Sequence, residues 1–589
     1  MKKIFYPIIA LMLCTSSCKD VLNISDLNSL DENEVWQDAN LVNAYLASVY
    51  PLFGNWVATI DTNSEQIAGI AFPLDAVTVN STNYKAWDYT TIRRINTGLA
   101  KIAESTGLSE ADKKAFRGQL LFMRAYVYFN MVKHHGGVPY ITIPQDLVSD
   151  DLNTPRNSTL ECFELIVKDL DEAVTLLPET IQKSSENYGK IDGNFALAFK
   201  GKVLLYKASP QYNVSNPYSN SYWNEAHVAN KAAYEKLLAN GYDLVDDYYN
   251  IALQEKGKEV VFAVINRFPN KGASYDYGVR PGSESRGAAS AVPTWEFVKS
   301  FPMKDGKLYS DPTGQFYKTE SQFLQSYWEN RDPRFEKSIV WNGKIYEVSG
   351  KSGKRQYTSV GVAADLDNFG TNPAAQTPSE NLNRYTGFFI LKNSKLSLKQ
   401  TEVETQYDVD YIVMRFAEVT LNYAETANET GDLNTALEML KKIRNRAGIL
   451  PGADGRYGIT AANKVDMRAA ILAERNIEFC FEGHRFWDLR RHRMLHVLDN
   501  TTKHGVEAIA INPDGSEMDL GDAAELAKTY QLTEQNFKYR VLQVPNTGAK
   551  VNFVPSTYYF FPIAQSVIDK NPKIQQNKDW GGAFDPVIN

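Results

Sequence analysis

YIVMRFAEVTLNYAETANETGDLNTALEMLKKIRNRAG, residues 411–448, predicts two consecutive amphipathic helices that pack as a pair. The apolar face of the first helix is marked by Tyr411, Phe416, Val419 and Tyr423. Gly431-Asp432 interrupts the pattern, and a second apolar face follows at Ala436, Leu440 and Ile443. Ala424 and Ala436 are twelve residues apart and Leu440 comes four later, which is the small-small-large register of a tetratricopeptide helix pair. This stretch therefore predicts a helical-repeat scaffold.

The same pattern recurs along the chain. Residues 112–134 with 158–177 and residues 194–208 with 223–240 form two more pairs, and residues 464–482 begin another. Each helix has an apolar face that cannot be buried alone, so we expect the pairs to stack into a right-handed scaffold. The predicted fold is mostly α, with a tetratricopeptide-like helical-repeat scaffold.

Two long irregular tracts separate the predicted helices. Residues 54–91 and 266–410 are rich in Gly, Ser, Asn, Pro and aromatic residues. Short strands are expected only at places such as Val260–Val264 and Phe388–Leu391. Because irregular segments of this length are uncommon in compact domains and are usually functional, we expect these tracts to carry the function.

Length and charge restrict the class of protein. The chain has 589 residues, a formal charge of −7 and 43% apolar residues, which predicts roughly four globular units rather than a disordered chain. The acidic balance and the lack of a basic block argue against nucleic-acid binding, which depends on clustered Lys and Arg.

The N-terminus has the features of an export signal. Lys2 and Lys3 precede ten almost wholly apolar residues, Ile4–Leu13, which is about half of the ~20 needed to span a bilayer. Small residues then lead to Cys18, as at a bacterial lipoprotein cleavage site. We predict a signal peptide at 1–17, acylation of Cys18 and a lipidated tether at 18–40. Two or more acyl chains would hold the protein stably at a membrane surface.

Several motifs quoted together resemble the RagB/SusD family of Bacteroidetes cell-surface nutrient-binding lipoproteins. They are Arg415–Glu425, Ala427–Glu429, Ile443-Arg444, Arg446–Gly448, Glu474–Phe479, Glu482–Arg491, Arg124–Tyr126, Gly136–Pro139, Arg331–Phe335, Thr386–Phe388, Phe561–Ile563 and Asn571-Pro572. The resemblance runs from the signal to the last twenty residues. It implies a SusD-like N-terminal helical-repeat region at 41–265. It also implies a RagB/SusD C-terminal region at 266–589 with a loop-rich insert and further repeats.

The resemblance implies capture of a ligand rather than catalysis. Similar proteins bind glycans or oligosaccharides at the outer membrane and cover a partner TonB-dependent transporter of the SusC type. Their ligand residues come from loops on one face, so loop aromatics edged by polar side chains are the candidates here. Our candidate ligand-binding residues are Trp56, Tyr84, Trp87, Tyr275, Tyr277 and Arg280. An oligopeptide receptor of the same fold and a surface glycosidase remain alternatives.

Motifs for catalysis and metal binding are incomplete. Residues 343–352 do not have the glycine spacing of a phosphate loop, and no GxSxG nucleophile elbow is present. We expect no catalytic residue and no cofactor. Metal ligation by His492 and His496 is disfavoured because no Glu lies between them as in HExxH. Structural calcium is considered at the loosely calcium-like Asp365, Asp367, Asn368 and Gly370 or at Asp514, Asp519 and Asp522, although solvated loop charge is the simpler interpretation of both.

The remaining polar and sulfur groups have structural interpretations. Cys162 and Cys480 lie in apolar helical patterns and are interpreted as buried thiols rather than a disulfide. His134 and His135 end a helix, where a cation near the carbonyl end is favourable. Glu474, Glu478 and Glu482 share one helix stripe, which predicts an ion network with nearby arginines; the candidates are Arg475, Arg485, Arg490 and Arg491.

Overall fold

The computed structural model describes most of the chain. The described residues are 32–54, 64–69, 77–80, 86–146, 150–268, 270, 274–285, 291–358, 386–403, 408–544, 550–551 and 555–588. Cys18, Trp56, Tyr84 and the acidic loop that begins at Asp365 lie outside them.

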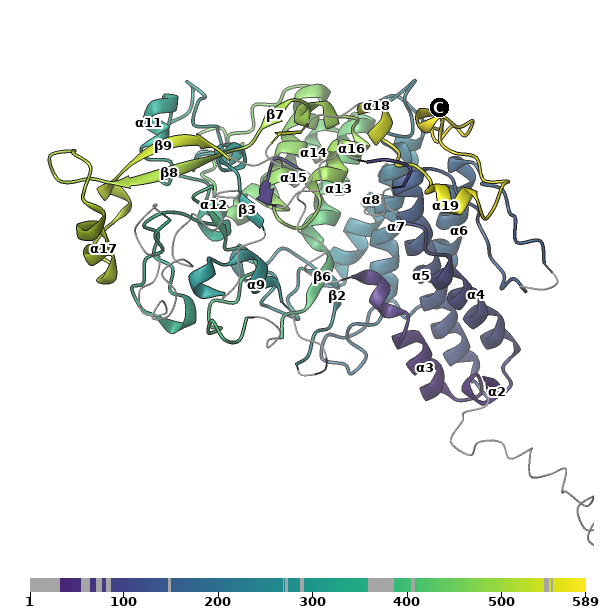
Figure 1. The fold of residues 1–589 in the computed structure, drawn as a ribbon. Helices are drawn as coiled ribbons and strands as arrows, with labels where there is room; N and C mark the ends of the chain where they lie inside the picture. The colour runs from purple at the N-terminus through teal and green to yellow at the C-terminus, as the bar shows by residue number, and fades with distance from the viewer. Residues whose placement is uncertain are drawn as a thin grey trace, which may run out of the picture.

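Paired antiparallel helices form the scaffold, as Figure 1 shows in its right half. The helices are α2 (Glu32–Val35), α3 (Ala39–Ala47), α4 (Tyr89–Glu104), α5 (Glu110–His135), α6 (Thr159–Leu176), α7 (Gly193–Ala208), α8 (Tyr222–Ala239), α13 (Phe416–Thr430), α14 (Leu433–Ala447), α15 (Lys464–Glu478) and α16 (Arg485–Arg491). Helix α5 packs on α6, α7 on α8 and α13 on α14, and α13 also contacts α8 and α15. The helix pairs predicted from the apolar spacing are confirmed.

Local sequence signals set the helix boundaries. Ser158 and Glu161 form a reciprocal capping box at the start of α6. The Asp432 side chain accepts a hydrogen bond from the Thr435 N–H at the start of α14. Gly431 and Gly448 end α13 and α14 in the left-handed conformation that glycine adopts without strain. The repeat therefore starts and stops where its sequence dictates.

The segment Tyr411–Arg415 corrects the expectation that the first helix of the quoted stretch begins at residue 411. It forms strand β6, which pairs antiparallel with β2 (Val260–Val264), and α13 begins only at Phe416. The backbone hydrogen-bonding groups of this extended segment find partners here, because the strand pairs with β2 and the Phe416 N–H donates to the Glu259 carbonyl. This ladder joins the N-terminal helices to the C-terminal half of the chain.

The left half of the molecule in Figure 1 consists of short elements and long connections. The strands there are β1 (Ile67–Gly69), β3 (Ala291–Pro293), β4 (Ile339–Val340), β5 (Phe389–Ile390), β7 (Thr501–Thr502), β8 (His504–Ala510), β9 (Phe537–Gln543) and β10 (Lys550–Val551). The helices there are α9 (Tyr275–Val279), α10 (Trp295–Ser300), α11 (Glu320–Leu324), α12 (Pro333–Ser338) and α17 (Leu520–Lys528), and α18 (Pro555–Tyr558) and α19 (Gln565–Ile568) lie near the C-terminus. Strand β1 pairs with β3, so the two irregular tracts meet.

Aromatic side chains fill the core of the helical half. The Phe195 ring stacks on Phe262 of β2 with centroids 4.3 Å apart, and its centroid lies 4.6 Å from that of the Phe122 ring of α5. These contacts join two helices and a strand through burial of large apolar surface, the main favourable contribution to folding. Cys162 and Cys480 are both buried free thiols, as predicted.

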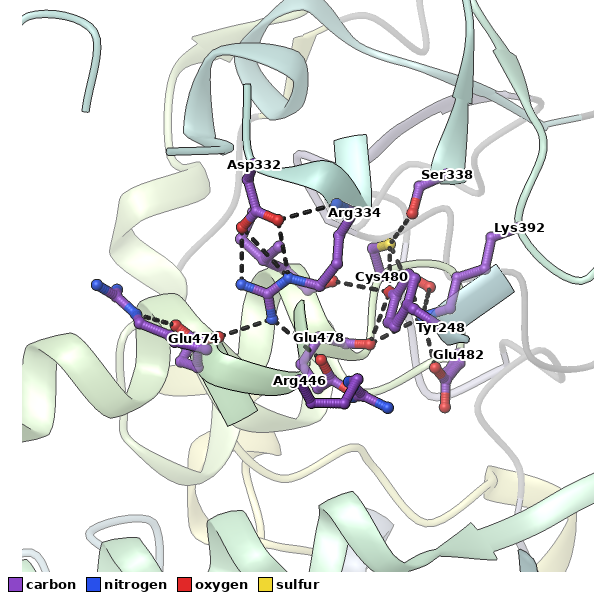
Figure 2. Close-up of polar contacts among 12 residues, drawn as sticks. Tyr248, Asp332, Arg334, Ser338, Lys392, Arg446, Glu474, Glu478, Cys480 and Glu482 are labelled. Carbon is purple, nitrogen blue, oxygen red and sulfur yellow. Dashed lines mark hydrogen bonds and ion pairs between the residues drawn. The ribbon is translucent and has the colours of Figure 1, made fainter. Parts of the chain in front are cut away.

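A buried ion network, part of which Figure 2 shows, joins α15 to Glu259, α12, β6 and α14. Arg334 contacts Asp332 at 2.7 Å, Glu474 at 2.7 Å and Glu478 at 3.0 Å. The other contacts are Arg415 with Glu259, Glu478 and Glu482, Arg446 with Glu259 and Glu478, and Arg444 with Glu474. The predicted structural network therefore exists and lies in the protein interior.

The arginines predicted as partners of this network bind other groups. Arg475 pairs with Asp488 at 2.8 Å, Arg491 pairs with Glu425 and Asp488, and Arg485 pairs with Glu65. Arg490 donates to the backbone carbonyls of Lys133, His134 and Tyr558. The prediction of partners was wrong because closeness in sequence does not decide which side chains meet in the fold: these arginines lie on α15 and α16, and they contact acids and carbonyls from other parts of the chain or from α16 itself.

Gly137 follows α5 in a place where no side chain fits. A Cβ atom there would lie 2.1 Å from the Asn157 carbonyl oxygen and 2.8 Å from the Phe584 ring. Because the backbone atom cannot move aside cheaply, we expect Gly137→Ala to lower the free energy of unfolding by about 1–3 kcal/mol. Urea unfolding measures this. Gly521→Ala in exposed α17, where the nearest atom is the movable Asp519 carboxylate at 3.0 Å, is the control and should change stability by less than about 0.5 kcal/mol.

Candidate ligand-binding site

A cavity of about 520 Å³ lies beside Trp87, between the start of α4 and the segment that follows α19. This volume is within the range of roughly 300–1,000 Å³ that is typical of small-molecule pockets. The lining residues are Trp87, Tyr89, Ile92, Arg93, Asn96, Pro139, Ile141, Ile143, Gln145, Leu152, Asn153, Thr154, Val567, Lys570, Asn571 and Ile574. Three separate parts of the chain thus form one recess.

The indole of Trp87 is held in place by its neighbours. Its ring centroid lies 5.3 Å from that of Tyr89 and 5.9 Å from that of His135, the latter in an edge-to-face arrangement. The Tyr89 hydroxyl donates to the Pro139 carbonyl at 2.6 Å. Asp88, next in sequence, caps α4 by accepting from the Thr91 N–H at 3.0 Å. A partly buried ring fixed in this way loses little conformational freedom when a ligand stacks on it.

The cavity has apolar walls and polar side chains at its rim. Ile143 and Leu152 are 66% and 41% exposed, so both present apolar surface to a ligand. Two amides of the lining are already engaged: Asn96 donates to the Ile141 carbonyl at 2.9 Å and Asn571 donates to the Thr154 carbonyl at 2.9 Å. Gln145, Asn153, Arg93 and Lys570 supply further polar groups. The arrangement suits a ligand with an apolar face and hydroxyl groups around it.

The candidates of the second tract lie elsewhere. Tyr275 is 2% exposed and its hydroxyl donates to the Lys392 carbonyl at 3.1 Å. Arg280 is fully buried, where it contacts Asp276 at 2.5 Å and donates to the Leu398 carbonyl at 3.0 Å. Tyr277 is 39% exposed. None of the three lines the Trp87 cavity, so the structure does not bring the described candidates together.

Sequence reasoning missed most of the cavity wall. Ile143 and Leu152 stand in a connection that was not among the two irregular tracts, and Asn571 was noted only within a family motif. In the sequence, the aliphatic residues 143 and 152 stand in a segment without helical spacing, and only the structure shows that they are exposed.

The second candidate calcium site shows ordinary loop contacts. Asp514 accepts from Ser516, and Asp519 caps α17 by accepting from the Gly521 N–H at 2.8 Å. Within the described ranges, no three acidic, His or Cys side chains gather as metal ligands would. Within the same ranges, no helix combines the length and the apolar run required to cross a bilayer.

Comparison with known proteins gives the family. The family model described as "SusD family" matches residues 258–580, and a second, described as "Starch-binding associating with outer membrane", matches residues 22–205. The chain belongs to the SusD family. The resemblance seen in its motifs is thereby confirmed.

Individual relatives agree with this assignment. SusD-like protein P38 of Formosa agariphila is 26% identical over 517 residues, which cover 81% of this chain and 88% of that protein. A SusD-like protein from Bacteroides fragilis has a TM-score of 0.70 at 23% identity, with 93% of this chain and 98% of that chain covered. A laminarin binding SusD-like protein has a TM-score of 0.56 at 19% identity, with 91% and 98% covered. These structural likenesses confirm the predicted helical-repeat fold.

Proposed function

We propose that this protein is a carbohydrate-binding receptor at the outer membrane that captures glycans or oligosaccharides for a SusC-type TonB-dependent transporter. The observation that carries the proposal is the Trp87 cavity, with its fixed indole, apolar walls and polar rim. Membership of the SusD family supports it, as does the outer-membrane association named in the description of the model matching residues 22–205. A solved relative described as a SusD-like carbohydrate binding protein, with a TM-score of 0.65, is consistent with this function.

The cavity chemistry fits a sugar, and Arg93 and Lys570 at its rim can donate to sugar oxygens. One face of a pyranose ring carries C–H groups that stack on an aromatic ring, while its hydroxyls need hydrogen-bond partners at the edge. Trp87 and Ile143 offer the apolar contact, and Gln145 and Asn153 offer the partners. Attachment through an acylated Cys18 would hold this receptor at the membrane without a spanning helix.

Trp87→Ala is expected to weaken binding of a glycan by about tenfold or more, because stacking on the indole is lost. A panel of polysaccharides is first screened for binding to the purified protein, and the affinity of the best ligand is then measured by isothermal titration calorimetry. Trp87→Phe, which keeps an aromatic face, should retain part of the affinity. The far-UV circular dichroism of each variant must match that of the original chain.

Tyr277→Ala distinguishes the two candidate regions. This exposed ring lies outside the cavity, so its removal should leave the affinity within about twofold of the original. If Tyr277→Ala loses glycan binding and Trp87→Ala retains it, the binding site lies in the second irregular tract, residues 266–410. Binding of oligopeptides with no response from the glycan panel would favour the peptide receptor, and release of products from a bound glycan would favour a glycosidase.

A further inference from the structure

A second cavity, of about 200 Å³, lies in the middle of the scaffold between α5 and α7 on one side and β6 and the Glu482–Trp487 segment on the other. Its polar and aromatic lining includes Lys133, Lys202, Tyr411, Glu482, His484 and Trp487. It shares no residue with the Trp87 cavity. Its volume is below the roughly 300 Å³ at which pockets for drug-sized ligands begin, so its occupant is restricted to about a single ring.

Most charges that face this cavity are already balanced. Lys202 contacts Glu418 at 2.8 Å. Glu482 contacts Lys392 at 2.6 Å and Arg415 at 2.9 Å. The His484 ring stacks on Phe479, and burial lowers the pKa of His484 to about 4, so this imidazole is neutral near pH 7. None of these groups leaves a charge for an incoming ligand.

Lys133 is the exception. Its Nζ atom lies 3.9 Å from the centre of the Trp487 ring, and no carboxylate of the described residues lies within ion-pair distance of it. Burial, with the neighbouring cations Lys202 and Arg490, lowers the pKa of Lys133 to about 7, although Glu418 acts in the opposite direction. The adjacent His134 is neutral because burial also lowers its pKa. The cavity therefore carries one cation in excess when Lys133 is protonated.

We propose that this cavity binds a small monocarboxylate the size of one sugar ring, with the carboxylate on Lys133 and the ring against Trp487. An anion that leaves bulk water for a cavity needs a cation partner, and of the two lysines that line this cavity Lys133 is the one without an ion pair among the described residues. One negative charge balances the site, whereas a dianion would add repulsion from Glu418 and Glu482. The aromatic lining supplies the apolar contact that a ring requires.

Protonation of Lys133 should be linked to binding. A bound carboxylate favours the charged form of the lysine, so it raises the pKa of Lys133 above its value in the empty cavity. Below about pH 7 the lysine is already charged and the affinity should be constant. Above that pH, binding should take up close to one proton and weaken by up to tenfold per pH unit until the pKa of the bound state is reached.

The test uses D-glucuronate, D-glucose and inorganic phosphate as probes of the purified protein, titrated by calorimetry at about pH 6.5. We expect D-glucuronate to bind at least about tenfold more tightly than D-glucose or phosphate. Lys133→Met should abolish this difference, Lys133→Arg should keep it, and Trp87→Ala should leave it unchanged. Repeating the titration at about pH 8 in two buffers of different ionisation enthalpy measures the proton uptake.

Several results would overturn the proposal. D-glucuronate that fails to bind, or that binds equally to Lys133→Met, would remove the role of the lysine. Equal binding of phosphate or glucose would contradict a monocarboxylate site. Circular dichroism checks the fold of Lys133→Met, and Lys133→Gln, which also removes the charge, replaces it should the first not fold. Because the two cavities share no residue, failure here leaves the function proposed for the Trp87 cavity intact.

Discussion

Replacing Glu478 by Gln is expected to lower the free energy of unfolding by about 3–5 kcal/mol. Glu478 is fully buried, and three arginines contact it: Arg334 at 3.0 Å, Arg415 at 2.7 Å and Arg446. Burial by itself would raise the pKa of Glu478, but these guanidinium groups hold that pKa well below its ordinary value. Glutamine keeps the shape, removes the charge and turns an NH₂ donor toward groups that are themselves donors.

Urea unfolding of Glu478→Gln and of a matched surface variant checks this expectation. Glu525 is 71% exposed and pairs with Lys528 on α17, so Glu525→Gln removes the same charge from an exposed ion pair. Its cost should stay below about 1 kcal/mol. If Glu478→Gln costs no more than Glu525→Gln, Glu259, Glu474 and Glu482 already neutralise the arginines, and Glu478 has no special part in the network.

Acidification is expected to lower the free energy of unfolding over two pH ranges, the first of which begins near pH 6.5. His135 is buried, its Nδ1–H donates to the Phe561 carbonyl at 3.1 Å, and its Nε2 accepts from the Ala86 N–H at 3.3 Å. Burial lowers the pKa of His135 to about 3. A proton added at Nε2 would also face the Ala86 N–H, so that two donors would point at one another. Burial lowers the pKa of His484 to about 4.

The direction of the effect follows from the folded-state pKa values. As the pH falls below about 6.5, histidines of the unfolded chain bind protons that His135 and His484 of the folded protein do not bind, so these two reduce stability by about 3 kcal/mol per pH unit. His134, whose pKa burial also lowers, adds to this loss. Below about pH 4.5 the carboxylates add to the loss. The pKa of Glu482, which burial alone would raise, is held at about 2 by Arg415 and Lys392. Asp192 opposes the trend between about pH 6 and 4, because burial raises its pKa to about 6.

Urea unfolding at a series of pH values measures this dependence. The variant His135→Gln removes one titrating group, so its stability should fall less steeply between about pH 6 and 4, by about 1.4 kcal/mol per pH unit. A free energy of unfolding that stays constant between about pH 7 and 5 would mean that the imidazoles bind protons in the folded protein, and the proposed cause would be wrong.

The helices could be predicted from the sequence because their signals are local. Apolar spacing within residues 416–447 and the glycines at 431 and 448 lie in the same few turns that they define. The strand at Tyr411–Arg415 could not be predicted, since its partner Val260–Val264 is about 150 residues away and its apolar residues also fit a helix. Residues 134 and 135 show a similar limit: the rule for helix ends favours cations there, but burial by tertiary contacts keeps both imidazoles neutral.

The candidate site was predictable only in part. Trp87 could be selected as a loop aromatic with no role in a helical face, and the structure places it in a cavity. The facing wall comes from residues 567–574, far along the chain, and no local pattern relates these residues to Trp87. Tyr275 and Arg280 looked equivalent to Trp87 in sequence, yet the structure buries both among internal partners.

The buried ion network also constrains how the chain can be made. Its members are Glu259, Asp332, Arg334, Arg415, Arg444, Arg446 and the glutamates 474, 478 and 482. During synthesis from the N-terminus, Arg334 and Arg415 emerge well before Glu474 and Glu478, so the ion pairs made by the glutamate stripe cannot all form until residue 482 has been synthesised. A nascent chain that stops earlier lacks the acidic residues that complete the centre of the fold. Folding to the native state is therefore a late event of synthesis, and separately expressed halves should not reproduce it.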